Sequence, residues 1–163
     1  MMKSSPGPAP SHVVRAAEGK RFDVLGAHLV WKARGEDTED TFTVAVQSLS
    51  PQESIPRHRH RYAEVFYILS GELEFTLFNG LNANTYTLSA GDSVMVAASS
   101  DHGVHNATKE QATLLDIAPI SHQHFFDTVQ REAPQWSALT PEETMHRVGE
   151  IGRKHTLEFW QPE

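Results

Sequence analysis

The sequence predicts an all-β protein, an antiparallel sandwich or barrel with a short helical tail. About eight short runs rich in Val, Phe, Tyr, Thr and Leu follow one another from Arg21 onward. Turn-forming residues separate these runs, and helical signals are confined to the C-terminal part of the chain. A chain of 163 residues without internal repeats fits one domain with a real core.

Three regions follow from this pattern. Residues 1–20 are rich in Pro, Ser and Gly and are predicted to form a flexible leader. The β barrel is expected over residues 21–120, and a helical tail packed on the barrel over residues 121–163. The expected strands have no internal proline and are Phe22–Leu25, His28–Ala33, Phe42–Leu49, Ala63–Leu69, Glu72–Phe78, Thr85–Leu88, Ser93–Ala97 and Ala112–Ala118.

Turns separate the strands in the middle of the chain. Ser70-Gly71 predicts a tight turn, and Ala90-Gly91-Asp92 predicts another. The segment Asn79–Asn84, which begins with Asn-Gly, predicts a longer hairpin loop.

Two helices are predicted in the tail. Ser121 is expected to cap a short helix over His122–Gln130. Thr140 precedes a proline at the first helical position and a glutamate at the third, which predicts a capped helix running to about Lys154.

Composition excludes several classes of function. The formal net charge of −7 gives no basic surface for nucleic acid. The chain has no cysteine, so any metal site has to use His and carboxylate ligands, and a reducing cytoplasm is the expected compartment. Residues 1–11 lack the apolar core of a secretory signal, and no stretch is long and apolar enough to predict a membrane span.

The segment around His58 and His60 carries the clearest chemical signal. In an extended strand, residues two apart point to the same face, so these two imidazoles project together and can bind one cation. Glu64 has the same parity and can reach the same point, whereas the intervening arginine points the other way. The alternative interpretation is a solvated, positively charged strand edge.

The flanking residues resemble the two-part signature of the cupin superfamily. The first part reads His-x-His, three or four residues, Glu, six residues and Gly, and the second ends in His, three residues and Asn. Here the matching residues are His58, His60, Glu64, Gly71, Gly91, His102 and Asn106. Gln52 stands where the first part often begins with Gly, and Ala97 and Ser99 replace the usual Pro and Gly of the second.

The resemblance covers about residues 22–129 and is strongest to single-domain cupins similar to one half of quercetin 2,3-dioxygenase. It implies an antiparallel double-stranded β-helix, or jelly roll, and a metal held by His58, His60, Glu64 and His102. It also implies that Glu64 can act as a catalytic base as well as a ligand. A homodimer is expected, chiefly from the resemblance.

Three other histidines are weighed separately. His105 becomes the ligand if its loop is shifted, but the spacing to Asn106 favours His102. His122 and His124 lie near a predicted helix start and are interpreted as surface or capping residues.

Imidazole and carboxylate ligands suit one divalent Fe, Mn, Ni, Co or Zn ion. The leading functional hypothesis is a dioxygenase-like oxidoreductase acting on a small enolisable or aromatic compound, with Phe66 and Ile68 facing the interior by their parity with Glu64. The alternatives are a non-redox isomerase or lyase and a non-catalytic module that binds a small molecule or metal, because one fold hosts many chemistries.

Overall fold

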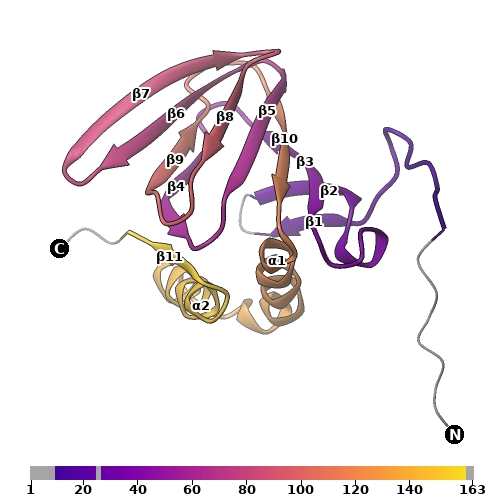
Figure 1. Cartoon of the computed structure of the whole chain (residues 1–163). Helices are drawn as coiled ribbons and strands as arrows, with labels where there is room; N and C mark the ends of the chain where they lie inside the picture. Colours follow the sequence, from indigo (N-terminus) through magenta and orange to yellow (C-terminus); the bar gives the residue numbers. More distant parts are fainter. Residues whose placement is uncertain (1–9, 25–26, 161–163) are drawn as a thin grey trace, which may run out of the picture.

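The computed structural model describes residues 10–24 and 27–160. In this part of the chain, eleven strands form two sheets in which every pairing is antiparallel (Figure 1). The first sheet has the order β1 (Arg21–Val24), β2 (Ala27–Ala33), β3 (Thr43–Leu49), β10 (Ala112–Ala118), β5 (Glu64–Ser70) and β8 (Ser93–Val96). The second has the order β11 (Leu157–Phe159), β4 (Ser54–His60), β9 (His102–His105), β6 (Glu72–Asn79) and β7 (Asn82–Ser89).

The two sheets enclose a core built from alternating side chains. In β5, Phe66 and Ile68 are buried while Tyr67 is exposed, and in β6 Leu73 and Phe75 are buried. The four buried side chains belong to one apolar cluster drawn from both sheets. The predicted antiparallel jelly roll is therefore confirmed.

The predicted strands match the structure best where the alternation is apolar and continuous. Ala112–Ala118 is β10 residue for residue, and most other strands differ by a few residues at their ends. Residue 25, which ends the first predicted strand, lies outside the described residues. The long loop predicted over Asn79–Asn84 was wrong, because β7 begins at Asn82 and leaves a two-residue turn.

Three strands, β4, β9 and β11, were not among the expected strands, although the extended geometry assumed for His58 and His60 is that of β4. The strand β4 contains Pro56 and shifts register between Ile55 and His58, so a proline that normally excludes a strand interior is accommodated at an irregularity. The other two are only four and three residues long, too short to show a pattern.

The helix α2 (Pro141–Lys154) begins where the capping signal placed it. The Glu143 amide donates to Thr140 Oγ1 over 3.2 Å, and the Thr140 amide donates to Glu143 Oε2 over 2.8 Å. The helix α1 (Ile120–Glu132) begins earlier than predicted, and Ser121 is not its cap. Its first turn closes instead through the His122 amide, which donates to the Pro119 carbonyl over 3.0 Å.

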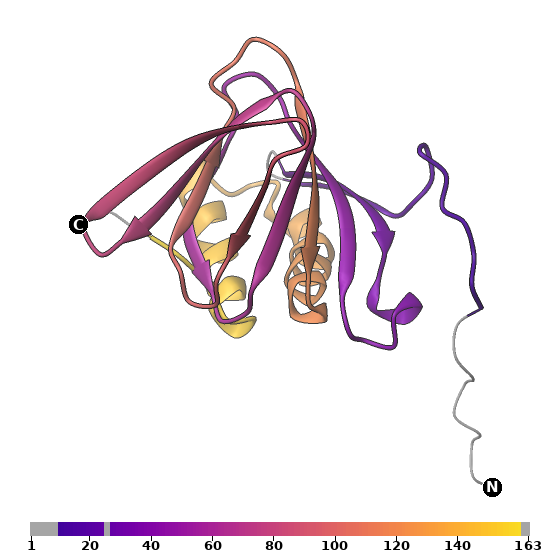
Figure 2. The same ribbon diagram turned by 45° about the horizontal axis from the view of Figure 1, so that its top comes forward.

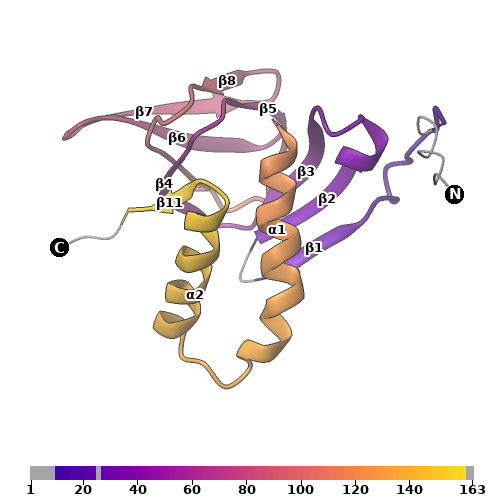
Figure 3. The ribbon, with the colours of Figure 1, turned by 60° about the horizontal axis from the view of Figure 1, so that its bottom comes forward.

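Both helices cover one end of the sandwich. Figure 2 shows them between the lower ends of the strands, and Figure 3 shows α1 beside β1–β3 and α2 beside β11. One short 3₁₀ turn, Gly35–Asp37, follows β2, and a second, Ala133–Trp136, lies between the two helices. A second apolar cluster joins Trp31 of the sheet to Phe125 of α1 and Val148 of α2. Through β11, which pairs with β4, the tail becomes part of the sheet that carries His58 and His60. None of the helices in the described residues is long and apolar enough to cross a membrane.

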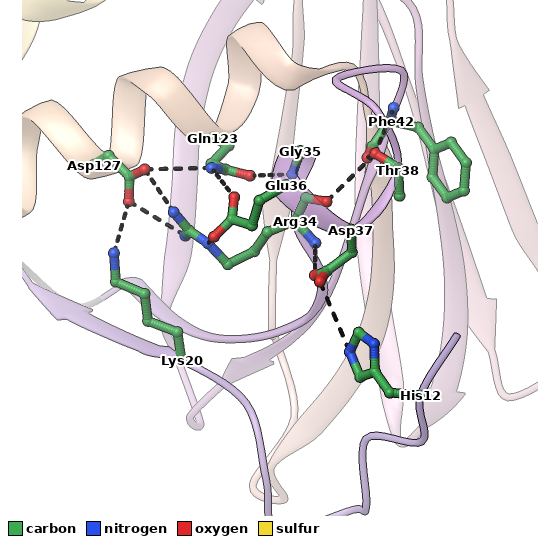
Figure 4. A network of polar contacts seen from close by, with 10 residues as sticks. All are labelled: His12, Lys20, Arg34, Gly35, Glu36, Asp37, Thr38, Phe42, Gln123 and Asp127. Atoms are coloured by element: carbon green, nitrogen blue, oxygen red, sulfur yellow. Dashed lines mark hydrogen bonds and ion pairs between the residues drawn. The ribbon is translucent and has the colours of Figure 1, made fainter. Parts of the chain in front are cut away.

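A polar network fastens α1 to the segment that follows β2 (Figure 4). The guanidinium of Arg34 donates to both carboxylate oxygens of Asp127, over 2.8 and 3.3 Å. Lys20 donates to the same carboxylate over 3.2 Å, and Gln123 accepts from the Gly35 amide over 2.8 Å. Burial opposes ionisation of Asp127, but its bonds to Arg34 outweigh this and hold its pKa below the ordinary value.

Because this pKa is lower in the folded chain, the pair stabilises the fold above pH about 4 and stops doing so as the pH falls further. We expect Asp127→Asn to lower the free energy of unfolding at pH 7 by about 1–2 kcal/mol. Urea unfolding at pH 7 and at pH about 3 should show the difference between wild type and variant shrinking in acid. Glu150→Gln, which removes an exposed partner of Arg147, is the control and should change little at either pH. An Asp127→Asn effect independent of pH would contradict the ion-pair explanation.

Candidate metal centre

Four buried side chains converge between the two sheets: His58, His60, Glu64 and His102. One potential ligand atom from each lies within 4.8 Å of the others. The ring centroid of His102 lies 4.1 Å from that of His58 and 5.0 Å from that of His60. The structure thus brings together the four residues that the sequence singled out, from β4, β5 and β9.

The three imidazoles share one hydrogen-bond arrangement. In each, Nδ1 lies 2.7–3.1 Å from a backbone carbonyl two residues away. The pairs are His58 with Pro56, His60 with Tyr62 and His102 with Ser100. A carbonyl only accepts, so Nδ1 carries the hydrogen and the Nε2 lone pair is available. The second hydrogen bond of each ring therefore prepares Nε2 to bind a metal.

The positions of these atoms fit a cation. The Nε2 of His60 lies 2.8 Å from Glu64 Oε2, although both atoms are acceptors in this tautomer, so a shared proton or a metal has to lie between them. The Nε2 of His102 is 3.5 Å from the same oxygen and has no hydrogen-bond partner among the described residues. Buried acceptors without donors are costly, and a divalent ion would satisfy all of them at once.

Protonation states favour the same conclusion. Burial, and next to it the neighbouring imidazole of His102, lowers the pKa of His58 to about 3, so the His58 imidazole is neutral near pH 7. Burial opposes ionisation of Glu64, but the charge of His122 and contacts with His102 and His60 outweigh it and hold the Glu64 pKa well below its ordinary value. Neutral imidazole and ionised carboxylate are the forms that bind metals.

Two turns that position the histidines keep a glycine-like backbone without glycine. Gln52 and Ser99 have φ of +67° and +66°, at positions where the cupin signature has Gly. The Ser99 amide donates to the His60 carbonyl over 2.7 Å, which ties the segment leading to His102 onto β4. The glycine after β5 is kept: Gly71 has φ of +76°, and a Cβ there would lie 2.8 Å from Ala112 Cα.

Next to the four residues lies a cavity of about 310 Å³. His58 and Glu64 are among its polar lining residues, and apolar side chains form most of its wall, among them Phe66, Phe125, Phe126, Val129, Leu157 and Phe159. Phe66 thus faces the cavity as its parity predicted, whereas Ile68 lies in the apolar core. Among the described residues that line the cavity, none is Lys or Arg.

Sequence reasoning missed a second polar group at this cavity. His122 was interpreted as a surface or capping residue, which was wrong: it is 5% exposed, and its Nδ1 lies 3.6 Å from Glu64 Oε1. Its Nε2 lies 2.9 Å from Asp116 Oδ2. Asp116, an inward-facing acid in the otherwise apolar alternation of β10, was the available signal, because a buried carboxylate needs a partner. Burial and Glu64 raise the Asp116 pKa, although His122 opposes this.

The remaining histidines lie away from the four. His105 contacts Ser54 Oγ and the Glu53 carbonyl through Nδ1 and is not part of the group. His124 is exposed, as predicted for a surface residue. Asn106 is fully buried and donates to the carbonyls of Leu49 and Glu110, so its role is to hold the segment after β9.

Comparison with known proteins agrees with the fold and the motif. The family model described as the cupin domain matches residues 45–118, a range that contains all four residues. This match covers 74 of the 163 residues and agrees with the antiparallel jelly roll. No curated protein matches the chain.

Several solved structures share the fold at low sequence identity. The polyketide cyclase RemF from Streptomyces resistomycificus is 20% identical, with a TM-score of 0.53 over 74% of this chain and 80% of its own. KdgF from a Halomonas species is 16% identical, with a TM-score of 0.58 over 68% and 94%. A predicted oxalate decarboxylase from Thermotoga maritima is 23% identical, with a TM-score of 0.58 over 66% and 98%. These likenesses show the fold, and the chemistry has to be argued from the site.

Proposed function

We propose that this chain is a cupin that holds one divalent transition metal through His58, His60, Glu64 and His102 and is a dioxygenase-like oxidoreductase. Its substrate is a small enolisable or aromatic compound bound in the adjoining cavity. The observation that carries the proposal is the convergence of four potential metal-binding side chains, of which His58 and Glu64 line a mainly apolar cavity. Fe, Mn, Ni, Co and Zn all suit these ligands.

When bound, the metal supplies a Lewis acid that polarises a carbonyl or enolate and offers open coordination positions. Glu64 is the group that takes a proton from a substrate hydroxyl, because it lines the cavity and its Oε1 has no hydrogen-bond partner among the described residues. The aromatic side chains in the cavity lining, which include Phe66, Phe125 and Phe159, hold an apolar ring and exclude water.

The cavity favours a neutral compound over a dianion such as oxalate. Its charged lining consists of Glu53, Glu64 and Asp116, with the imidazoles of His58 and His122, and includes no Lys or Arg among the described residues. An anionic carboxylate bound there would find only the metal and His122, which is already paired with Asp116 and Glu64, whereas bidentate recognition of carboxylates depends on Arg.

Metal replacement tests the proposal. Metal-free protein is loaded in turn with Fe(II), Mn(II), Ni(II) and Co(II), and oxygen consumption is followed with a flavonol and with a β-diketone. We expect at least one form to consume oxygen and Glu64→Gln to lose this activity while the protein stays folded. If all four forms leave oxygen untouched with both substrates, the oxygenase proposal fails.

A non-redox isomerase or lyase is the second candidate. The pair formed by His122 and Asp116 favours it, because both side chains line the cavity beside Glu64 and offer a second acid–base group. Substrate turnover that continues under strict anaerobic conditions would support this candidate over the first.

A homodimer is part of the proposal. The apolar side chains Val44, Ile117, Val65 and Met95 form one row across four strands on the outer face of the first sheet. The chain carries a net charge of −7, but this row has no charged side chain, and Met95 is 67% exposed. A second copy of the chain can therefore cover this face without charge repulsion within the row. A molar mass of 18.2 kDa in solution, that of one chain, would contradict the dimer.

A further inference from the structure

The helix α1 inserts one imidazole between two buried carboxylates. The Nε2 of His122 lies 2.9 Å from Asp116 Oδ2, and its Nδ1 lies 3.6 Å from Glu64 Oε1. The hydroxyl of Tyr62 lies 2.9 Å from the same Nδ1. Asp116 comes from β10 and His122 from α1, whereas Tyr62 lies two residues before Glu64; His122, Asp116 and Glu64 are each at most 5% exposed.

The His122 ring has one orientation available. Asp116 can only accept when ionised, so Nε2 donates to it and Nδ1 is turned toward Tyr62 and Glu64. Aromatic rings hold the imidazole from the sides: the Phe126 and Tyr62 centroids lie 4.9 and 5.8 Å away, both edge-to-face. A ring fixed at both nitrogens and on its faces cannot turn without breaking these contacts.

The consequence falls on Glu64, whose two oxygens face different groups. Oε2 lies 2.8 Å from His60 Nε2 and 3.5 Å from His102 Nε2, on the side of the metal-binding histidines. Oε1 lies on the other side, against His122. Rotating the carboxylate to present both oxygens to a metal would carry Oε1 away from His122.

We propose that His122 is a positioning residue that holds the Glu64 carboxylate with one oxygen toward the metal and the other toward the cavity. This inference rests on the proposed metal centre, though not on the oxygenase reaction. Asp116 and Tyr62 act through His122 by fixing its ring.

Packing alone does not account for this arrangement. The helix α1 is already fastened by the ion pair of Arg34 with Asp127 and by the burial of Phe125 and Val129. Burying the pair of Asp116 and His122 carries a desolvation cost that apolar residues at both positions would avoid. The presence of His122 and Asp116 is therefore better explained by a role at the site, and the contact of His122 with the metal-binding carboxylate of Glu64 provides one.

A matched pair of variants separates positioning from packing. In His122→Asn the amide takes the place of Nδ1, beside Glu64, whereas in His122→Gln it takes the place of Nε2, beside Asp116. The Asn variant removes one methylene more than the Gln variant, so a larger loss in the Gln variant cannot come from lost volume. Co(II) affinity, measured by chelator competition, and the visible absorption spectrum of the Co(II) protein report on how Glu64 binds the metal.

We expect His122→Gln to weaken Co(II) binding by about 10–100-fold and to shift the spectrum, as for other residues that support metal ligands. His122→Asn should retain more of both. His124→Gln, an exposed position on the same helix, should behave as wild type. If His122→Gln fails to fold, Tyr62→Phe provides the test, because it keeps the ring stacked 4.0 Å from His60 and removes only the hydroxyl.

Equal losses in the Asn and Gln variants would indicate a structural role and overturn the inference. So would a wild-type spectrum and affinity in His122→Gln. A wild-type protein that binds no Co(II) would overturn the metal centre and this inference with it. One that binds Co(II) but consumes no oxygen with any metal would overturn only the oxygenase function.

Discussion

Replacing His58 and His102 together by alanine should abolish stoichiometric metal binding. The double variant removes two of the four converging side chains and leaves only His60 and Glu64. Loss of a residue that merely supports a ligand costs about 10–100-fold in affinity, so loss of two ligands should cost more than about 100-fold. Metal content per chain, measured on protein purified without chelators or nickel resin, is the readout.

The control is His105→Ala with His124→Ala, which removes the same number of histidines outside the group. This control should keep the wild-type metal content. Wild type with no bound metal, or a His58/His102 double variant that retains it, would contradict the proposed centre. Far-ultraviolet circular dichroism of all three proteins guards against loss of fold as the cause.

The second large effect is expected at Gly152, where α2 meets β11. A Cβ at this position would lie 2.7 Å from the Leu157 carbonyl oxygen, a backbone atom that cannot move aside without shifting β11. Since Leu157 pairs with His60 and lines the cavity, the strain reaches the strand that carries the metal-binding histidines. We expect Gly152→Ala to lower the free energy of unfolding by about 1–3 kcal/mol.

Gly149→Ala is the matched control in the same helix. A Cβ there would meet only the end of the Arg153 side chain, at 3.7 Å, an ordinary contact. Because alanine in a helix interior is more favourable than glycine by about 0.5–1 kcal/mol, this variant should be as stable as wild type or more stable. Urea unfolding of both variants, with hydrogen exchange at β11, measures the contrast. Similar stabilities for the two would show that β11 tolerates the extra methyl group.

Local sequence patterns predicted a large part of the fold. The alternation over Ala112–Ala118 is β10, and the Thr140 capping signal places the start of α2. The His58 and His60 side chains share a face, as their spacing requires. These features depend only on residues a few positions apart, because strand pleat and helix capping are set by local geometry.

Other features depended on contacts between distant segments. The strand β4 is polar and contains a proline, and it is a strand because β9 and β11 pair with it. The approach of His102 to His58 required the jelly-roll topology, and the sequence predicted it only through the cupin resemblance.

The sequence by itself determined which side chains face inward on the predicted strands and which residues can bind a metal. Only the tertiary structure decided that His122, which lies 58 positions beyond Glu64 in the chain, reaches the Glu64 carboxylate and that Asp116 holds the His122 ring in this place. Spacing predicts contacts along one element, whereas packing of a helix on a sheet is set by the whole apolar core and leaves no short-range pattern.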